Sequence, residues 1–485
     1  MKTFVMLAGL VLGATLSAEA ETAVIHHQVS SVAAAQAAFD RGLLDYYAYN
    51  PEAAQHEFYT AADLDPHLAM AWWGVALSNA PNLNVAATND RDTQARSAIL
   101  KAKALEGSAT PEDQAFIDAA AARFAGEKNA REDALETSYR DALQKIAQAN
   151  PGDPDAAALY AEAALYVADP GDDWIYDSLS PQQRADYRAR LTALLPYFQA
   201  SLAKFPLHVG LEHFYIHTAQ MAGRSDLAVG AATQLAAFTF PPEDSHLTHM
   251  PGHIFFDVGM YAQALDVAQR SVDMDYADFA CCHPGYYSAT RFYHNHNVSF
   301  LLYAMTQTGH TDDAVAAARR ANNDVMVAKQ LVAAARWQEV VALDSAAGGP
   351  VLPFARGLAY AHLGDIARAE AALAAIPDAA ADSPAGVANV AAMRLTLQGE
   401  IAAAQHDDAK ALQLLTDASA AATKGQVLGD PEMPALYYYS SHLALAALAT
   451  KMDKPDVARA ALQAELAASP KSSAATAALA KLGSF

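Results

Sequence analysis

Cysteine is almost absent from this chain. Its 485 residues include two cysteines, Cys281 and Cys282, which are adjacent. Adjacent cysteines can bridge only through a strained ring, so a stabilising disulfide framework is excluded. Two interpretations stay open: packed or free thiols, or a redox-active or metal-binding pair beside His283.

Long apolar runs are missing beyond the first residues. Lys2, the apolar run Phe4–Leu16 and the small-x-small pattern ending at Ala20 are typical of a cleavable signal peptide. This run is too short to cross a bilayer as a helix, and no later segment is long enough without charges. We therefore expect cleavage after Ala20, a periplasmic or secreted mature chain, and no membrane insertion after cleavage.

Positive charge and β-branched stretches are also scarce. The chain has 32 lysines and arginines against 54 acidic residues, a net charge of -22. Such an acidic surface argues against nucleic acid or anionic lipid as a partner. The abundance of alanine favours helices. We therefore expect an all-α protein.

A repeat is present near the N-terminus. Gly42, Ala54, Phe58, Ala61 and Pro66 match the small, small, large, small and proline positions of the tetratricopeptide repeat (TPR), a helical hairpin. The small residues let two helices approach, and the proline ends the second helix. The predicted fold is a TPR-like helical-hairpin solenoid, a superhelix with a concave groove.

Turn glycines such as Gly223, Gly259, Gly309 and Gly364 align later units with this repeat. The predicted organisation is a signal peptide (1–20), an N-terminal segment (21–34), N-terminal TPR-like hairpins (35–99), a less regular helical region (100–205), His-rich TPR-like units (206–328) with an insertion at 278–291, and C-terminal TPR-like hairpins (329–485).

Histidines recur at matching repeat positions. His213 and His217 lie four residues apart, on one face of a helix, and His249 and His253 repeat this pair at an offset of thirty-six residues. That offset is near the repeat period, so the pairs should occupy equivalent positions five and nine of stacked first helices. Imidazoles from such neighbours can converge on one ion.

The first helix of the next unit adds His294 and His296, and His296 falls on position two of that helix. Met221 and Asp257, one turn beyond the pairs, are further candidates, whereas His208 and His246 are expected to be caps or loop residues. Imidazole suits copper, zinc and iron, and the sequence leaves the ion open. The predicted metal ligands are His213, His217, His249, His253, His296 and His294.

Three stretches resemble a family of large, often exported bacterial TPR proteins that lack an established activity. They are Leu64–Gly74, Glu212–His217 and His249–Ile254. The family pattern His-Asn-x-His-Phe-Leu falls on His296–Leu301, where Ser299 replaces the second histidine. The resemblance implies the TPR fold and a shared groove site, with five imidazoles in place of six.

The predicted function is an exported solenoid with a His-rich transition-metal site in its groove. As an enzyme it would be a metal-dependent oxidase or hydrolase acting on a small molecule in the groove, with Glu212 or Asp244 as a base or as a partner of an imidazole. Both acids are more simply solvated charges. The alternatives are a scaffold that binds a peptide or protein partner along the groove, and a metal carrier. No catalytic residue or oligomeric state is assigned.

Overall fold

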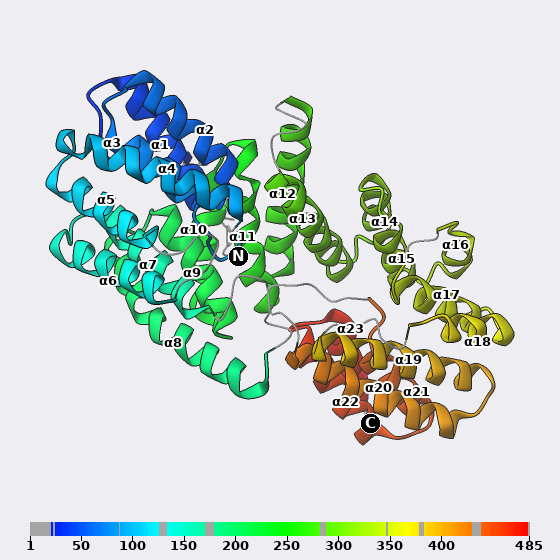
Figure 1. Cartoon of the computed structure of the whole chain (residues 1–485). Coiled ribbons are helices and arrows are strands. Elements are labelled where there is room, and N and C mark those ends of the chain that lie inside the picture. Colours follow the sequence, from blue (N-terminus) through cyan, green and yellow to red (C-terminus); the bar gives the residue numbers. More distant parts are fainter. Residues whose placement is uncertain are drawn as a thin grey trace, which may run out of the picture.

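The chain folds as a curved array of helical hairpins, which confirms the all-α prediction and the TPR-like solenoid (Figure 1). The computed structural model describes residues 21–22, 25–86, 88–125, 133–169, 179–281, 288–345, 348–377, 383–428 and 438–483. The predicted signal peptide lies outside these ranges. Among the described residues, no helix combines the length and the apolarity that crossing a membrane requires.

The N-terminal hairpins pair consecutive helices around small residues. Phe58 is buried between Gly42 and Gly74, where an added Cβ would lie 2.9 and 2.4 Å from its ring. The predicted less regular region also forms packed helix pairs. The helices are α1 (Ala33–Tyr47), α2 (Pro51–Leu64), α3 (Ala69–Ser78), α4 (Asn89–Leu105), α5 (Pro111–Arg123), α6 (Asp133–Ala149), α7 (Pro154–Ala168) and α8 (Pro181–Lys204).

The middle hairpins place their first helices side by side. α9 packs on α11 and α11 packs on α13, and turn glycines with positive φ, such as Gly223 (72°) and Gly259 (71°), end first helices. The helices are α9 (Val209–Met221), α10 (Val229–Ala237), α11 (Ser245–Asp257), α12 (Tyr261–Cys281), α13 (Ser288–Gln307) and α14 (Thr311–Arg320). α12 and α13 thus extend into the predicted insertion 278–291, while Cys282 and His283 lie outside the described residues.

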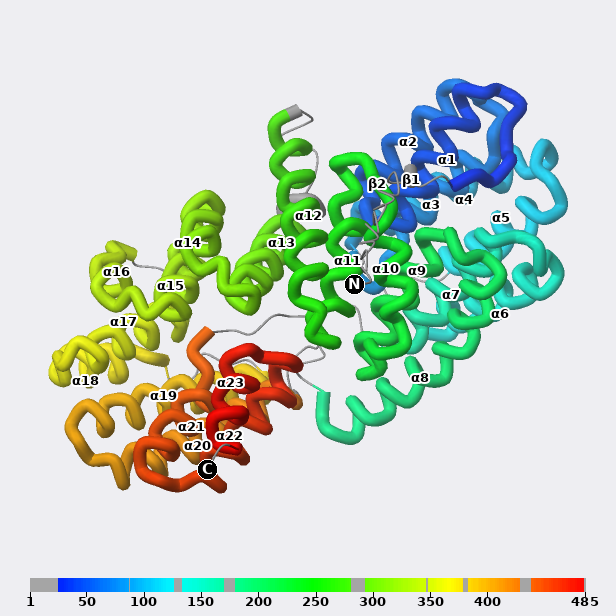
Figure 2. Tube along the Cα trace, turned by 180° about the vertical axis from the view of Figure 1, so that it is seen from behind, coloured from blue at the N-terminus to red at the C-terminus, as the bar shows by residue number. Residues whose placement is uncertain are grey.

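The C-terminal helices curve back toward the middle of the chain (Figures 1 and 2). The Tyr261 hydroxyl donates to the Pro470 carbonyl at 2.7 Å, and the Tyr303 and Ser469 hydroxyls lie 2.9 Å apart. The helices are α15 (Asp324–Ala333), α16 (Trp337–Ala342), α17 (Val351–His362), α18 (Ile366–Ala374), α19 (Pro384–Ala404), α20 (Asp408–Leu428), α21 (Ser441–Lys451), α22 (Pro455–Ala468) and α23 (Ser473–Leu482).

The N-terminal segment lies against helices far along the chain. Its strand β1 (Glu21–Thr22) pairs in parallel with β2 (Phe238–Thr239), which follows α10 (Figure 2). The Gln36 side chain, on α1, accepts hydrogen bonds from the backbone nitrogens of Val29 and Ser30. These contacts hold the segment against α1 and against the strand that follows α10.

Candidate metal centre

Two groups of three histidines converge in the middle hairpins. The first triad is His213 and His217 on α9 with His246 on α11, and the second triad is His249 and His253 on α11 with His296 on α13. Within each triad, one ligand nitrogen from each ring lies within 4.8 Å of the others.

The Nε2 atoms face one another at short range in both triads. In the first, Nε2 of His213 lies 3.1 Å from Nε2 of both His217 and His246. In the second, Nε2 of His253 lies 2.8 Å from that of His249 and 3.3 Å from that of His296. Nitrogens bound tetrahedrally to one ion at about 2.0–2.1 Å are about 3.3 Å apart, so these sets are close to ligand spacing.

The repeat explains why the triads resemble each other. Each combines positions five and nine of one unit with position two of the next unit, because neighbouring first helices stack in register. His246 and His296 are therefore equivalent residues. Sequence reasoning expected His246 to be a cap or loop residue, but it is the second residue of α11. His246 occupies position two of its unit, as His296 does, and this shared position could have identified it from the sequence.

Burial keeps these imidazoles neutral. His213, His217, His246, His249 and His253 are each at most 4% exposed, and His296 is partly buried. Burial lowers the pKa of His217 to about 3 and that of His296 to about 4, and in His296 repulsion by the protonated form of neighbouring His217 lowers it further. It also places the pKa of the other four well below the usual value. Near neutral pH each ring keeps a lone pair for an ion.

One hydrogen bond fixes the tautomer of His213 in the first triad. Nδ1 of His213 lies 2.6 Å from the backbone oxygen of Tyr47, on α1. A carbonyl only accepts, so Nδ1 carries the proton and Nε2 carries the lone pair. Such outer partners orient metal-bound histidines in proteins.

Aromatic rings enclose both triads. The ring of Tyr49 lies 4.8 Å from that of His213, and Tyr293 stacks on His246 at 4.3 Å. Phe300 lies 4.6 Å from both His249 and His253. The two triads are therefore enclosed by aromatic side chains between the helices.

The triads adjoin each other. The ring centroids of His246 and His249 are 6.4 Å apart, and those of His217 and His253 are 6.5 Å apart. Within the second triad the centroid separations are 4.7–5.3 Å. The six rings therefore form one continuous cluster with two centres.

The remaining predicted ligand, His294, lies apart from both triads. Its Nδ1 is 3.0 Å from Oδ2 of Asp275, and its ring packs on Tyr276 and Phe279. His296 is at position two, and His294 lies two residues earlier on α13. Residues two apart on a helix point to different sides, so only His296 reaches the cluster.

The weaker candidates have other contacts. Met221 accepts a hydrogen bond from the Tyr187 hydroxyl at 3.6 Å, and Asp257 accepts one from Ser225 at 2.6 Å. His208 is the predicted cap: its Nδ1 accepts from the backbone nitrogen of Leu211 at the start of α9.

Glu212 and Asp244 are buried, so neither is a solvated charge. Burial raises the pKa of Glu212 to about 9. For Asp244, burial followed by the neighbouring charge of Glu243 raises the pKa to about 8. Both carboxyls are therefore mainly protonated near pH 7, which removes the usual advantage of a carboxylate as a base.

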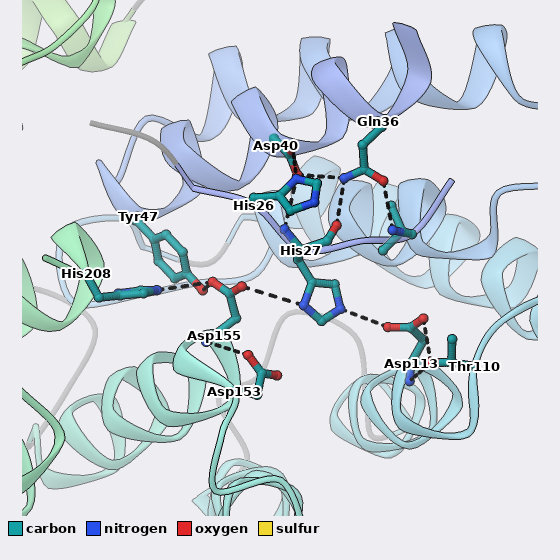
Figure 3. Close-up of polar contacts among 11 residues, drawn as sticks. His26, His27, Gln36, Asp40, Tyr47, Thr110, Asp113, Asp153, Asp155 and His208 are labelled. Atoms are coloured by element: carbon teal, nitrogen blue, oxygen red, sulfur yellow. Dashed lines mark hydrogen bonds and ion pairs between the residues drawn. The ribbon is translucent and has the colours of Figure 1, made fainter. Parts of the chain in front are cut away.

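A third group, His27 with Asp153 and Asp155, is an ion-pair network (Figure 3). Nε2 of His27 lies 2.9 Å from Oδ1 of Asp113, and Nδ1 lies 3.6 Å from Oδ2 of Asp155. Burial alone would lower the pKa of His27, but the hydrogen bonds to these carboxylates outweigh it and raise the pKa to about 10. The ring is therefore a cation without a free lone pair for a metal.

This network, the His27 clasp, reaches the first triad. Asp155 also accepts from the Tyr47 hydroxyl at 2.7 Å and lies 3.2 Å from Nε2 of His208 (Figure 3). Tyr47 in turn holds His213 through its backbone oxygen. The clasp thus ties the N-terminal segment, α5 and α7 to the helices that carry the histidines.

These features define a TPR-like helical solenoid with a buried histidine cluster. No protein-family model matches the chain, and neither does any curated protein. Among solved structures, Cut9 in the APC/C hetero-tetramer Cut9–Hcn1 is 17% identical, with 92% of this chain and 76% of that chain covered and a TM-score of 0.31. The human IFIT1 dimer with m7Gppp-AAAA is 12% identical (92% and 91% covered, TM-score 0.32), and yeast Tom70 is 11% identical (93% and 95%, 0.27). Likenesses this distant carry no argument about function.

Proposed function

We propose that this chain holds two transition-metal ions, one in each histidine triad. The observation that carries the proposal is the repetition of one arrangement: three converging imidazoles from positions five, nine and two of consecutive units. Without an ion these nitrogens can share only N–H···N hydrogen bonds, whereas an ion could bind all three lone pairs of a triad.

The donor set favours transition metals. Neutral imidazole nitrogens suit zinc, copper, iron and nickel, whereas magnesium and calcium prefer oxygen ligands. Both triads present nitrogen donors, and the pKa values of their rings are lowered. Zinc, copper and iron are therefore the ions to test.

Three protein ligands leave a coordination position open. Catalytic sites in proteins share this property, whereas structural sites are closed. The burial of the triads favours a small reactant, such as water or dioxygen. We therefore propose a metal-dependent enzyme, an oxidase or a hydrolase. A metal carrier needs rapid exchange, which buried ligands hinder. The proposal includes export, supported by the signal-like residues 1–20.

Elemental analysis of the mature protein without a His-tag tests the proposal. We expect about two equivalents of transition metal in the wild type, and about one in either His213→Ala or His249→Ala, because each substitution removes one ligand of three. The double variant should hold none. His294→Ala is the matched control and should keep both ions, because His294 pairs with Asp275.

Circular dichroism should show intact helices in each variant, because each substitution changes one side chain in an array that is held by packing between many helices. Failure of the wild type to retain stoichiometric metal after reconstitution with copper, zinc and iron would contradict the proposal. It would leave the histidines as contacts of a binding scaffold.

A further inference from the structure

A loop between α3 and α4 approaches the first triad. Asn82 and Val85 form an isolated antiparallel bridge, and the backbone nitrogen of Asn84 donates to Oδ1 of Asn82 at 2.9 Å. These bonds hold Asn84 in a tight turn. Asn84 lies 162 residues before His246 in the sequence.

The Asn84 amide lies beside the converging nitrogens. Its Nδ2 is 3.4 Å from Nε2 of His246 and 3.2 Å from the hydroxyl of Tyr293, whose ring stacks on His246. Its Oδ1 is buried and accepts no hydrogen bond from the described residues. In this orientation the amide therefore bonds only through its nitrogen, which is the end that faces the triad.

We infer that Asn84 supplies a fourth, oxygen ligand to the ion of the first triad. The inference rests on the proposed function. An ion in this triad uses the lone pair of His246 Nε2, so the Asn84 N–H group then has no acceptor there. Rotation of the amide by half a turn exchanges its nitrogen and oxygen, which have nearly the same size. Its oxygen then faces the ion and also accepts from the Tyr293 hydroxyl.

The second triad is covered by an aromatic side chain and not by an amide. Phe300 packs against all three of its rings, at 4.6 Å from His249 and His253 and 4.8 Å from His296. An aromatic ring supplies no oxygen ligand. The two centres are therefore inequivalent. Asn84 would complete four protein ligands at the first centre, so the open coordination position of the proposed enzyme belongs to the second centre, which has three imidazoles and an apolar cover.

Zinc titration of metal-free protein in a His249→Ala background tests the inference, because the first triad alone stays intact there. Adding Asn84→Ala should weaken zinc binding by about 10- to 100-fold, the range typical of lost supporting groups at metal sites. Adding Asn84→Asp should restore the affinity, since a carboxylate oxygen also binds zinc. Tyr293→Phe keeps the loop and both rings, and should weaken binding in the same direction by a smaller factor.

The control is Asn84→Ala in a His213→Ala background, where zinc binds the second triad and its affinity should not change. The same zinc affinity with and without Asn84→Ala in the His249→Ala background would overturn the role of Asn84 and leave the two-ion proposal standing. Absence of zinc binding by wild type and by both single-histidine variants would instead remove the proposed function itself.

Discussion

One side chain type exists in two charge states within this protein. His27 lies between the carboxylates of Asp113 and Asp155 and is held as a cation, with its pKa raised to about 10 despite burial. The triad histidines are more deeply buried and face other imidazoles, so their pKa values fall. The neighbouring charges decide whether an imidazole forms an ion pair or offers a lone pair to a metal.

Replacing His27 with alanine should destabilise the fold, because it leaves Asp113 and Asp155 buried without their cation. We expect the free energy of unfolding to fall by about 3 kcal/mol near neutral pH. The matched control is His26→Ala: His26 is exposed and pairs with Asp40, so its loss should cost less than about 1 kcal/mol. Urea unfolding followed by circular dichroism measures both.

The pH dependence of the His27 clasp has a defined sign. The pKa of His27 rises from 6.5 in the unfolded chain to about 10 in the folded protein. The folded state therefore binds more protons, and the contribution to stability is full below pH 6.5 and disappears as the pH rises toward 10. The difference between wild type and His27→Ala should shrink over this interval. A constant difference would contradict the ion pair.

At the scale of elements, the hairpin is the unit that builds the site. α9, α11 and α13 are the first helices of consecutive units, and their stacking aligns positions five and nine of one helix with position two of the next. The same packing operates at the N-terminus, where Phe58 of α2 fills the space left by Gly42 and Gly74. Close helix approach therefore depends on these small residues.

Gly74→Ala should destabilise the N-terminal hairpins. Its Cβ would lie 2.4 Å from the buried ring of Phe58, which cannot move without disturbing α1 and α3. Overpacking of this kind costs about 1–3 kcal/mol. Gly230→Ala on α10 is the control: its Cβ meets nothing within 4 Å, so the change should be neutral or stabilise by about 0.5 kcal/mol. Equal midpoints of thermal unfolding for the two variants would contradict this packing.

At the scale of the whole molecule, contacts distant in sequence close the array. The turn before α23 reaches the middle hairpins, where the Pro470 carbonyl accepts from Tyr261 and Ser469 bonds to Tyr303. At Gly259 an added Cβ would lie 2.7 Å from the Pro470 oxygen, so the approach requires glycine. Ordinary solenoid repeats contact only their neighbours, and this closure adds a longer-range link.

Removing the two hydroxyls of this closure should loosen the C-terminal helices. The double variant Tyr261→Phe/Tyr303→Phe loses both hydrogen bonds. Each bond contributes about 1 kcal/mol, so each substitution should increase the rate of local opening of the C-terminal helices about fivefold. Hydrogen exchange of amides in α22 and α23 measures the effect. Tyr160→Phe, which loses a hydroxyl bonded to Gln144 at 3.0 Å elsewhere in the array, is the control. Unchanged exchange in the double variant would show that the closure does not hold these helices.

Features that depend on near neighbours along the chain could be predicted without the structure. Helical periodicity, the small residues around Phe58 and the His-x3-His pairs are written within one or two turns of helix. The regular offset between the pairs also predicted that His213, His217, His249 and His253 would occupy equivalent positions. The hairpin fold was predictable for the same reason, since each repeat is a local unit.

Which other groups join the cluster depends on how distant parts of the chain pack together. The choice of His296 over His294 depends on the rotation of α13, which packing against α11 and α12 sets. The start of α11 at Ser245 brings His246 into the first triad. Asn84 and the His27 clasp depend on contacts between distant segments of the chain. Asn84 and His246 are 162 residues apart, and His27 and Asp113 are 86 residues apart. Such contacts follow from the stacking and curvature of the whole array, which no local pattern specifies.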